Sequence, residues 1–243
     1  MDKFHYKDKP EIEKISNIDC FTYREKGSHK YVVMVPAWFG SMFSQAEIIK
    51  VVTSTFLKEK NKYNLNIIIP KFGKEYNKNS LNATEYIWAI SDELELILKE
   101  IKEVDHLAEF VLTSHSWGGV SLAYFLSKNN LEEFNIKNIL MICPTFSYSN
   151  QNKAKKFINM SHNNDILKKN KEKFLENFKS IFEKIKGNCN YGNIDIIVPD
   201  SDWQCTEEDA NFFVTNSKLI LIKDSNHIFN IVRKKAIYLN KKN

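Results

Sequence analysis

Short apolar runs alternate with longer segments of helical periodicity from residue 31 onward, and this alternation constrains the fold more than any other feature. The apolar runs are YVVMVP (31–36), NLNIIIP (64–70), EFVLTS (109–114), KNILMICP (137–144), NIDIIVP (193–199) and KLILIKD (218–224). Continuous apolar runs are typical of strands covered on both faces, as in a parallel sheet. Helical periodicity marks the segments 44–60, 82–104, 119–129 and 231–239. The alternation predicts right-handed βαβ units, hence an α/β fold with helices on both faces of a mostly parallel, twisted sheet.

The N-terminal region adds two strands of another kind. The stretches IEKISN (12–17) and IDCFTYRE (18–25) alternate enough in polarity to predict two antiparallel strands, with a turn at Gly27–Ser28. Together with the six apolar runs, they predict a sheet of about eight strands. We find no internal repeat and no low-complexity linker, so residues 1–243 are interpreted as a single domain.

Composition excludes several classes of function. With 43% hydrophobic and 27% charged residues, the chain has the balance of a globular protein. The net charge of +5 comes from lysines diluted among asparagine and glutamate. No basic stripe interleaved with aromatic residues is present, so we expect no nucleic-acid partner. No run reaches the ~18 apolar residues of a membrane span.

The cysteines and the first residues bear on the compartment. Cys20, Cys143, Cys189 and Cys205 are scattered, with no CxxC motif and no metal-ligand spacing, so no metal site is predicted. The opening MDKFHYKDKPEIEK has no apolar core of the kind found in secretory signals. These observations predict reduced thiols and a cytoplasmic location, although a Cys189–Cys205 bridge is a possible alternative.

One segment interrupts the rhythm, at about 146–190, between the runs ending in ICP and NIDIIVP. It is longer than the few residues usual for a connection in such folds. Apolar residues recur in it at helical spacing, with lysines and glutamates between them: Phe174, Leu175, Phe178, Ile181, Phe182 and Ile185. Three interpretations are open: a surface helix covering the sheet, a helical cap over a pocket, or a helix that contacts a membrane surface.

The stretch TSHSWGG (113–119) follows an apolar run and leads into a predicted helix, and it contains two of the seven glycines of the chain. It resembles the nucleophile elbow of the α/β-hydrolase family, G-x-S-x-G, in which a serine sits on a strained strand-to-helix turn. Gly118 fills the second small position of that motif, and Ser114 replaces the first glycine with another small residue. The resemblance covers nearly the whole chain and implies that Ser116 is a catalytic nucleophile.

The resemblance also implies a base and an acid in the chain order serine, acid, histidine. His227 stands just beyond the last predicted strand, where the family places its histidine. The acid is expected after the preceding strand, in IDIIVPDSDWQC, which offers Asp200 and Asp202. Asp202 is closer to the usual position of the family's aspartate and is preferred, with Asp200 kept as the alternative. The implied triad is therefore Ser116, Asp202 and His227.

An oxyanion hole completes the implied site. The backbone N–H of Trp117, at the start of the predicted helix, supplies one donor. The second is expected from VPAWFGS, where Pro36 has no N–H and the donor is either Ala37 or Trp38, with Trp38 preferred. Aromatic and small residues on the surrounding loops either fill the top of the core or line an apolar substrate pocket. The pocket candidates are Ala37, Phe39, His115, Phe146 and Trp203.

The resemblance implies a serine hydrolase that cleaves a small-molecule carboxylic ester or thioester through an acyl-enzyme, without metal or organic cofactor. Three alternatives use the same fold: an acyltransferase, a proline iminopeptidase-like peptidase, and a non-catalytic binding module. The residues leave the acyl chain, the leaving group, the oligomeric state and the pathway open.

Overall fold

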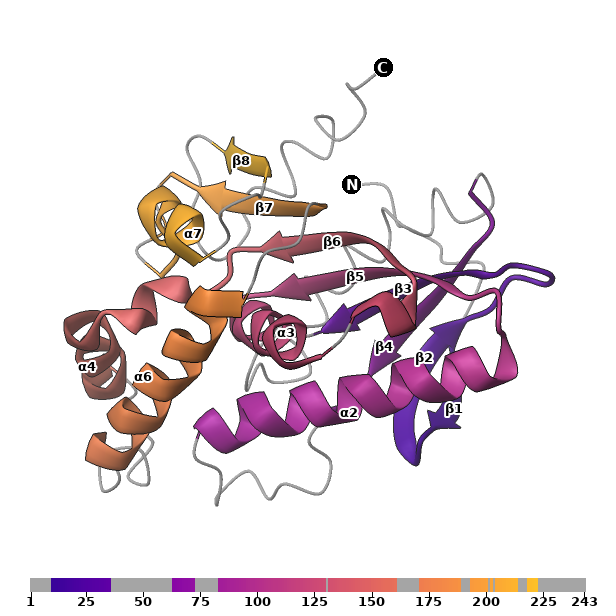
Figure 1. The fold of residues 1–243 in the computed structure, drawn as a ribbon, viewed down its shortest axis with the longest axis horizontal. Coiled ribbons are helices and arrows are strands. Elements are labelled where there is room, and N and C mark those ends of the chain that lie inside the picture. Colours follow the sequence, from indigo (N-terminus) through magenta and orange to yellow (C-terminus); the bar gives the residue numbers. More distant parts are fainter. Residues whose placement is uncertain are drawn as a thin grey trace, which may run out of the picture.

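The structure is a computed structural model that describes residues 10–35, 63–72, 83–129, 131–160, 171–188, 193–200, 202, 204–213 and 218–222. Its strands form one sheet in the order β1-β2-β4-β3-β5-β6-β7-β8 (Figure 1). The strands are β1 (Glu11–Ile15), β2 (Ile18–Tyr23), β3 (Lys30–Val35), β4 (Leu65–Pro70), β5 (Glu109–His115), β6 (Ile136–Ile142), β7 (Ile194–Pro199) and β8 (Lys218–Ile222).

From β4 to β8 across the sheet, every neighbouring pair of strands is parallel. β1 and β2 are antiparallel to each other, and β2 is antiparallel to β4. The six apolar runs coincide with β3 to β8, so the predicted eight-stranded, mostly parallel sheet is confirmed. In β3 and β4 the last five residues are all buried, as expected for strands covered on both faces.

The hairpin turn lies at a different place from the one expected. β1 and β2 are joined by Ser16 and Asn17, which both have positive φ, 50° and 63°. Two such residues make a turn whose twist matches that of the strands, and asparagine tolerates this conformation well. The predicted turn at Gly27–Ser28 exists but separates β2 from β3, with the N–H of Ser28 donating to the carbonyl of Glu25 at 3.1 Å.

Two long helices cover one face of the sheet. α2 (Ala83–Val104) and α3 (Trp117–Lys128) lie side by side beneath the strands (Figure 1). α2 is amphipathic and points its apolar stripe at the sheet, burying Ile87, Ile90, Leu94 and Ile97 completely. These residues join the inward side chains of the strands in the main hydrophobic core. The predicted helices at 44–60 and 231–239 lie outside the described residues.

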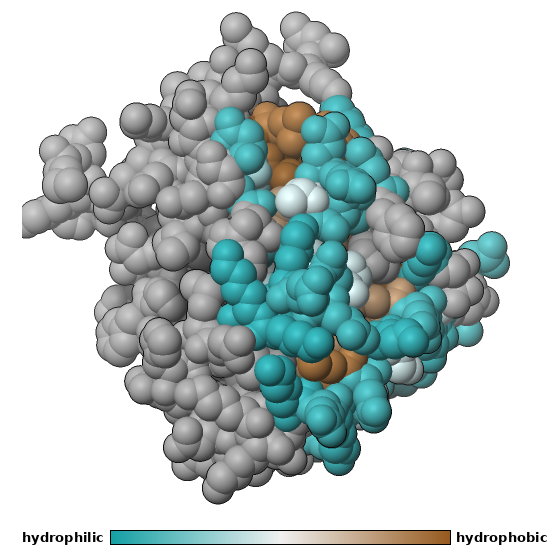
Figure 2. Space-filling model, turned by 90° about the vertical axis from the view of Figure 1, so that its left-hand side faces the viewer, coloured by the Kyte–Doolittle hydropathy of each residue, from teal (hydrophilic) through white to brown (hydrophobic). Residues whose placement is uncertain are grey.

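The region between β6 and β7 contains η2 (Phe146–Ser149), α4 (Gln151–Met160) and α6 (Lys171–Asn188). α6 packs chiefly against α3. Its six predicted apolar residues are all buried and belong to the main core. Figure 2 views the side of the molecule that carries α4, α6 and α7 (Glu207–Phe213), where the described surface is mainly hydrophilic with small hydrophobic areas. The apolar face of α6 is therefore occupied by the protein's own core and is not available to a membrane.

None of the helices in the described part of the chain combines the length and apolar content that a membrane-spanning helix needs. Within the same residues, no group of three histidine, cysteine or acidic side chains is arranged to hold a metal ion.

Candidate active site

Ser116 connects the carboxyl end of β5 to the first residue of α3. Its backbone has φ 53° and ψ −121°, a combination that side-chain-bearing residues adopt rarely and at a cost of about 1–3 kcal/mol. Its side chain does not cap the helix. A serine held in a costly conformation, without serving as a helix cap, matches the strained strand-to-helix turn expected from the sequence.

Three backbone hydrogen bonds hold this turn. The N–H of Ser116 donates to the carbonyl of Ile142, at the end of the neighbouring strand β6, over 2.9 Å. The carbonyl of Ser116 accepts from the N–H of Gly119 at 2.9 Å and from the N–H of Thr145 at 3.3 Å. The conformation of Ser116 is thus held by contacts with the end of β6, with the first turn of α3 and with the segment that follows β6.

Gly119 allows the segment after β6 to approach α3. A Cβ atom built on Gly119 would stand 2.5 Å from the Cβ of Pro144 and 2.9 Å from its Cα. Side chains do not tolerate such distances, so this position has room for glycine only. The second glycine of the pair is therefore explained by the contact between α3 and Pro144, in addition to the small position assigned to Gly118.

We expect Gly119→Ala to lower the free energy of unfolding by roughly 1–3 kcal/mol, because the new methyl group must push the backbone of Pro144 away. Urea unfolding followed by circular dichroism measures the change. Ser127→Ala in the same helix is the control, since it removes one hydroxyl hydrogen-bonded to the Tyr124 carbonyl without adding an atom. Unchanged stability in Gly119→Ala would show that the contact with Pro144 relaxes easily.

The two candidate acids differ in burial. Asp202 is only 4% exposed, whereas Asp200 is exposed. Both follow β7, and the N–H of Asp202 donates to the carbonyl of Pro199 at 3.2 Å, which turns the chain back over the end of the strand. The Oδ1 atom of Asp202 accepts the backbone N–H of Gln204 at 2.8 Å. Asp202 is the acid that points into the protein.

Three groups near Asp202 are held in their neutral forms. Burial, and then the negative charge of Asp202, raise the pKa of the Cys143 thiol and that of the Cys205 thiol well above their usual values. The same two causes raise the pKa of the Tyr148 phenol. Asp202 is therefore buried beside three neutral groups, and in such surroundings a charge interacts more strongly with a partner than it does in water.

Ile142 and Cys143, at the end of β6, connect the turn at Ser116 to the neighbouring strand β7. Ile142 accepts the N–H of Ser116, and the N–H of Cys143 donates to the carbonyl of Ile197 in β7 at 2.9 Å. β5 and β7 lie on either side of β6, so the ends of these two strands are separated by two strand spacings, about 10 Å. An imidazole hydrogen-bonded at both nitrogens spans roughly 8 Å between its partner oxygens. This strand spacing is of the size that an imidazole between the two side chains requires, as the predicted triad does.

Other predicted site residues are only partly placed. His115 is buried at the end of β5, and the Phe146 side chain is fully buried within the main core. The indole of Trp117 also lies in this core, with its centroid 5.4 Å from the Tyr148 ring and 5.0 Å from the Phe178 ring. Ala37, Trp38, Phe39, Trp203 and His227 lie outside the described residues, so the second oxyanion donor and the base remain predictions.

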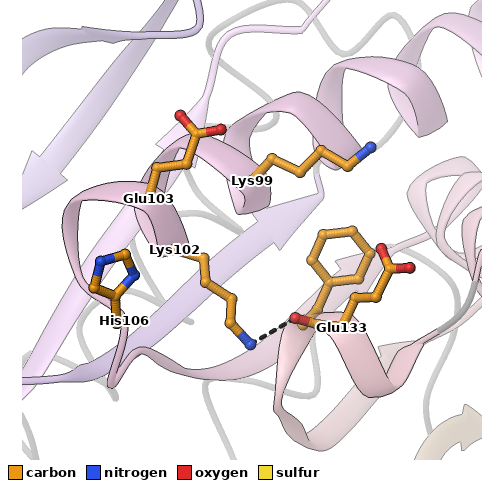
Figure 3. A pocket seen from close by; sticks show the side chains of 6 residues that line it. Lys99, Lys102, Glu103, His106 and Glu133 are labelled. Carbon is orange, nitrogen blue, oxygen red and sulfur yellow. Dashed lines mark hydrogen bonds between the residues drawn. The ribbon is translucent and has the colours of Figure 1, made fainter.

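A surface hollow of about 370 Å³ lies elsewhere (Figure 3). It is formed by α2 and the η1 turn (Leu131–Phe134), with the Nζ of Lys102 donating to the carbonyl of Glu133 at 2.6 Å. Figure 3 shows the side chains of Lys99, Lys102 and Glu103 extending from α2. These residues directly precede β5 and β6, so the hollow lies at the amino ends of the strands. Ser116 lies at the carboxyl ends, on the opposite side of the sheet's length.

Sequence reasoning missed Tyr148, Gln204 and the helix α7 beside Asp202. The hydroxyl of Tyr148 donates to the Oε1 of Gln204 at 2.7 Å, between residues 56 positions apart. No pattern in the sequence predicts a contact between residues so far apart. The start of α7 does have a signal: Thr206 and Asp209 have the spacing of a capping box, and the Thr206 Oγ1 accepts the Asp209 N–H at 3.2 Å.

No protein-family model matches the sequence, and no curated protein matches it. Solved structures do match. Est1E from Butyrivibrio proteoclasticus superposes with a TM-score of 0.62 at 12% identity, over 92% of each chain. The Pyrococcus furiosus esterase PF2001 gives 0.59 at 17% identity, over 96% of this chain and 85% of that one. XC6422 from Xanthomonas campestris, described as an α/β serine hydrolase without lid, gives 0.57 at 12%, over 96% and 91%.

Likeness at this level of identity concerns the fold. The sheet order, with two antiparallel strands before a parallel series, agrees with the near-complete superposition on these hydrolase structures. The turn at Ser116 also stands where the resemblance requires it, between the fifth strand and the helix that follows. This protein has the α/β-hydrolase fold.

Proposed function

We propose that this protein is a serine hydrolase that cleaves a carboxylic ester or thioester, with Ser116 as nucleophile, His227 as general base and Asp202 as the orienting acid. The observation that carries the proposal is the backbone of Ser116, with φ 53° at the junction of β5 and α3. Backbone strain of this kind persists where the surrounding structure holds it in place, and it is frequent at active sites, so it supports a chemical role for Ser116. The esterases and serine hydrolases among the structural neighbours support the same class of reaction.

The reaction has two steps. Ser116 Oγ forms a bond to the substrate carbonyl carbon while its proton passes to His227, and the charge on the oxygen is stabilised by backbone donors. The bond to the leaving alcohol or thiol then breaks, and His227 returns the proton to that group. Water then attacks the carbonyl carbon of the acyl-enzyme while His227 takes a proton from it. The carboxylic acid product leaves, and His227 returns the proton to the Ser116 Oγ. Asp202 accepts a hydrogen bond from the imidazole and stabilises its charged form throughout.

The N–H of Trp117 is the first oxyanion donor in this proposal, and Trp38 or Ala37 supplies the second. The indole of Trp117 packs on Phe178 of α6, so this helix supports the elbow from one side. In this view residues 1–243 are one domain, and the inserted segment at about 146–190 is a small helical cap. The described cysteines, Cys20, Cys143 and Cys205, are free thiols, which supports a cytoplasmic location.

A fluorophosphonate probe tests the proposal without knowledge of the natural substrate, because it phosphonylates serines that have an activating base. We expect one covalent adduct, located on Ser116 by mass spectrometry. A panel of p-nitrophenyl esters and acyl thioesters of graded length then identifies the acyl preference, with His227→Ala as the inactive control. Labelling without hydrolysis of any panel member would favour an acyltransferase. Absence of both labelling and hydrolysis would indicate a non-catalytic binding module.

A further inference from the structure

Tyr148 lies where the nucleophile turn and the acid loop meet. It belongs to η2, which directly follows β6, and its side chain is 2% exposed. The Tyr148 ring packs against the Trp117 ring, and the two ring centroids are 5.4 Å apart. Its hydroxyl donates to the Oε1 of Gln204 at 2.7 Å. A single side chain thus contacts the residue after Ser116 and the residue two positions after Asp202.

Gln204 is held at three of its polar groups. Its Oε1 accepts the Tyr148 hydroxyl, and its backbone carbonyl accepts the N–H of Ser147 at 3.2 Å. Its own N–H donates to the Oδ1 of Asp202 at 2.8 Å. Because a hydrogen bond to one carboxylate oxygen restricts rotation of the group, the position of the other oxygen is set as well.

A second anchor keeps η2 and α7 together. The Asp209 carboxylate accepts hydrogen bonds from the hydroxyls of Ser147 and Thr206 and from the Nζ of Lys153, the last at 3.0 Å. Burial opposes ionisation of Asp209, but these hydrogen bonds and the lysine charge outweigh it and hold its pKa below the usual value. The charged pair of Asp209 and Lys153 therefore fixes the distance between Ser147 and the start of α7, and with it the place of Gln204.

We infer that Tyr148 and Gln204 are positioning residues, which orient the Asp202 carboxylate toward the catalytic base by way of the Tyr148 O–H to Gln204 hydrogen bond. The inference rests on the proposed function, because it assigns these residues a role only if Asp202 orients His227. Neither residue contacts the reacting atoms in this scheme. The effect of the Tyr148 O–H to Gln204 hydrogen bond on the reaction passes through Asp202, whereas the packing of the Tyr148 ring on Trp117 is a separate contribution.

The test measures the second-order rate constant of fluorophosphonate labelling at Ser116 as a function of pH. We expect Tyr148→Phe, which keeps the ring packing on Trp117, to slow labelling about three- to tenfold, the effect of one buried hydrogen bond. The acidic limb of the profile should also move to lower pH, because a less well oriented carboxylate stabilises the imidazolium less. The Cys143 and Cys205 thiols stay neutral over this range because their pKa values are raised well above the usual value, and Asp209 stays ionised because its pKa is held below its usual value.

Tyr31→Phe is the matched control. The Tyr31 hydroxyl donates to the Oδ2 of Asp105 at 2.9 Å, so this variant also removes one hydroxyl of a buried tyrosine that donates a hydrogen bond. It does so near the amino end of β3, on the edge of the sheet opposite Ser116. We expect its labelling rate and pH profile to equal those of the wild type.

A double-mutant cycle separates positioning from packing. In an Asp202→Asn background, Tyr148→Phe should have almost no further effect on the labelling rate. Gln204→Met, which removes the Oε1 acceptor but keeps the backbone N–H, should resemble Tyr148→Phe, and the two changes should not add. Wild-type rates and an unshifted profile in both single variants would overturn the inference, as would equal slowing in the Asp202→Asn background. Failure of the wild type to label at Ser116 would instead overturn the proposed function.

Discussion

Ser116→Ala is expected to lose fluorophosphonate labelling completely and to lower ester hydrolysis by roughly 10⁴–10⁶-fold. In the proposed mechanism, the variant deletes the atom that bonds to the substrate carbonyl. It also leaves the backbone intact, because alanine and serine pay the same cost at φ 53°. The three backbone hydrogen bonds at this position involve no side-chain atom. The loss is measured with the probe and with the best ester of the panel, at equal thermal stability of the two proteins.

Ser114→Ala, two residues earlier in β5, is the matched control for this loss. Ser114 is 1% exposed, and its Oγ has no hydrogen-bond partner within the described part of the chain. Removing an unsatisfied buried hydroxyl costs little and can stabilise a protein. We expect full labelling in this variant. A probe adduct that survives in Ser116→Ala and disappears in Ser114→Ala would move the nucleophile and contradict the assignment.

Asp202→Asn is expected to lower hydrolysis by about 10³–10⁴-fold, the size of effect known when a triad carboxylate becomes an amide. The amide can donate to the imidazole as well as accept, so it no longer enforces the required tautomer, and it carries no charge to stabilise the imidazolium. The side chain keeps its size, and the Gln204 N–H keeps an acceptor oxygen. The measurement is kcat/KM for the preferred ester over a range of pH.

Asp200→Asn makes the same chemical change at the exposed neighbour. The link of Asp200 to β8 is a backbone bond, from its N–H to the carbonyl of Ile222 at 3.0 Å, which the substitution does not touch. We expect activity within about twofold of the wild type, as for most surface changes. The reverse outcome, with Asp200→Asn inactive and Asp202→Asn active, would identify Asp200 as the acid and would also remove the basis of the positioning role of Tyr148.

The strands of this fold could be predicted because their burial is visible in the chain itself. Stretches such as Tyr31–Val35 and Ile67–Pro70 are apolar at consecutive positions, which only a strand covered on both faces requires. The N-terminal turn could not be placed as reliably. Gly27 carries the stronger turn signal, yet the hairpin reverses at Ser16–Asn17, because the pairing of β1 with β2 decides between the two.

Some residues of the candidate site could likewise be predicted from the sequence, and others could not. Ser116 was identifiable because its neighbours must be small and its position follows an apolar run. Asp202 and Asp200 could be separated only by burial, which depends on how the chain turns back at Pro199. Gly119 was recognised as part of a pair, but the reason for it is the backbone of Pro144, 25 residues later in the printed sequence. Contacts between distant segments are set by packing in the folded protein, and such contacts produce no residue spacing in the sequence from which they could be predicted.

The sheet order described above has a consequence for how this protein can diversify. The serine stands at the end of β5, flanked by β3 and β6, and the connections after β6 and β7 meet around it at one rim. Those connections also carry part of the main core, because the apolar face of α6 after β6, and Cys205 and Ala210 after β7, are buried in it. If the proposed function holds, a new substrate preference is therefore expected from single side-chain changes at the rim, because exchange of a whole segment would also remove packing from the core.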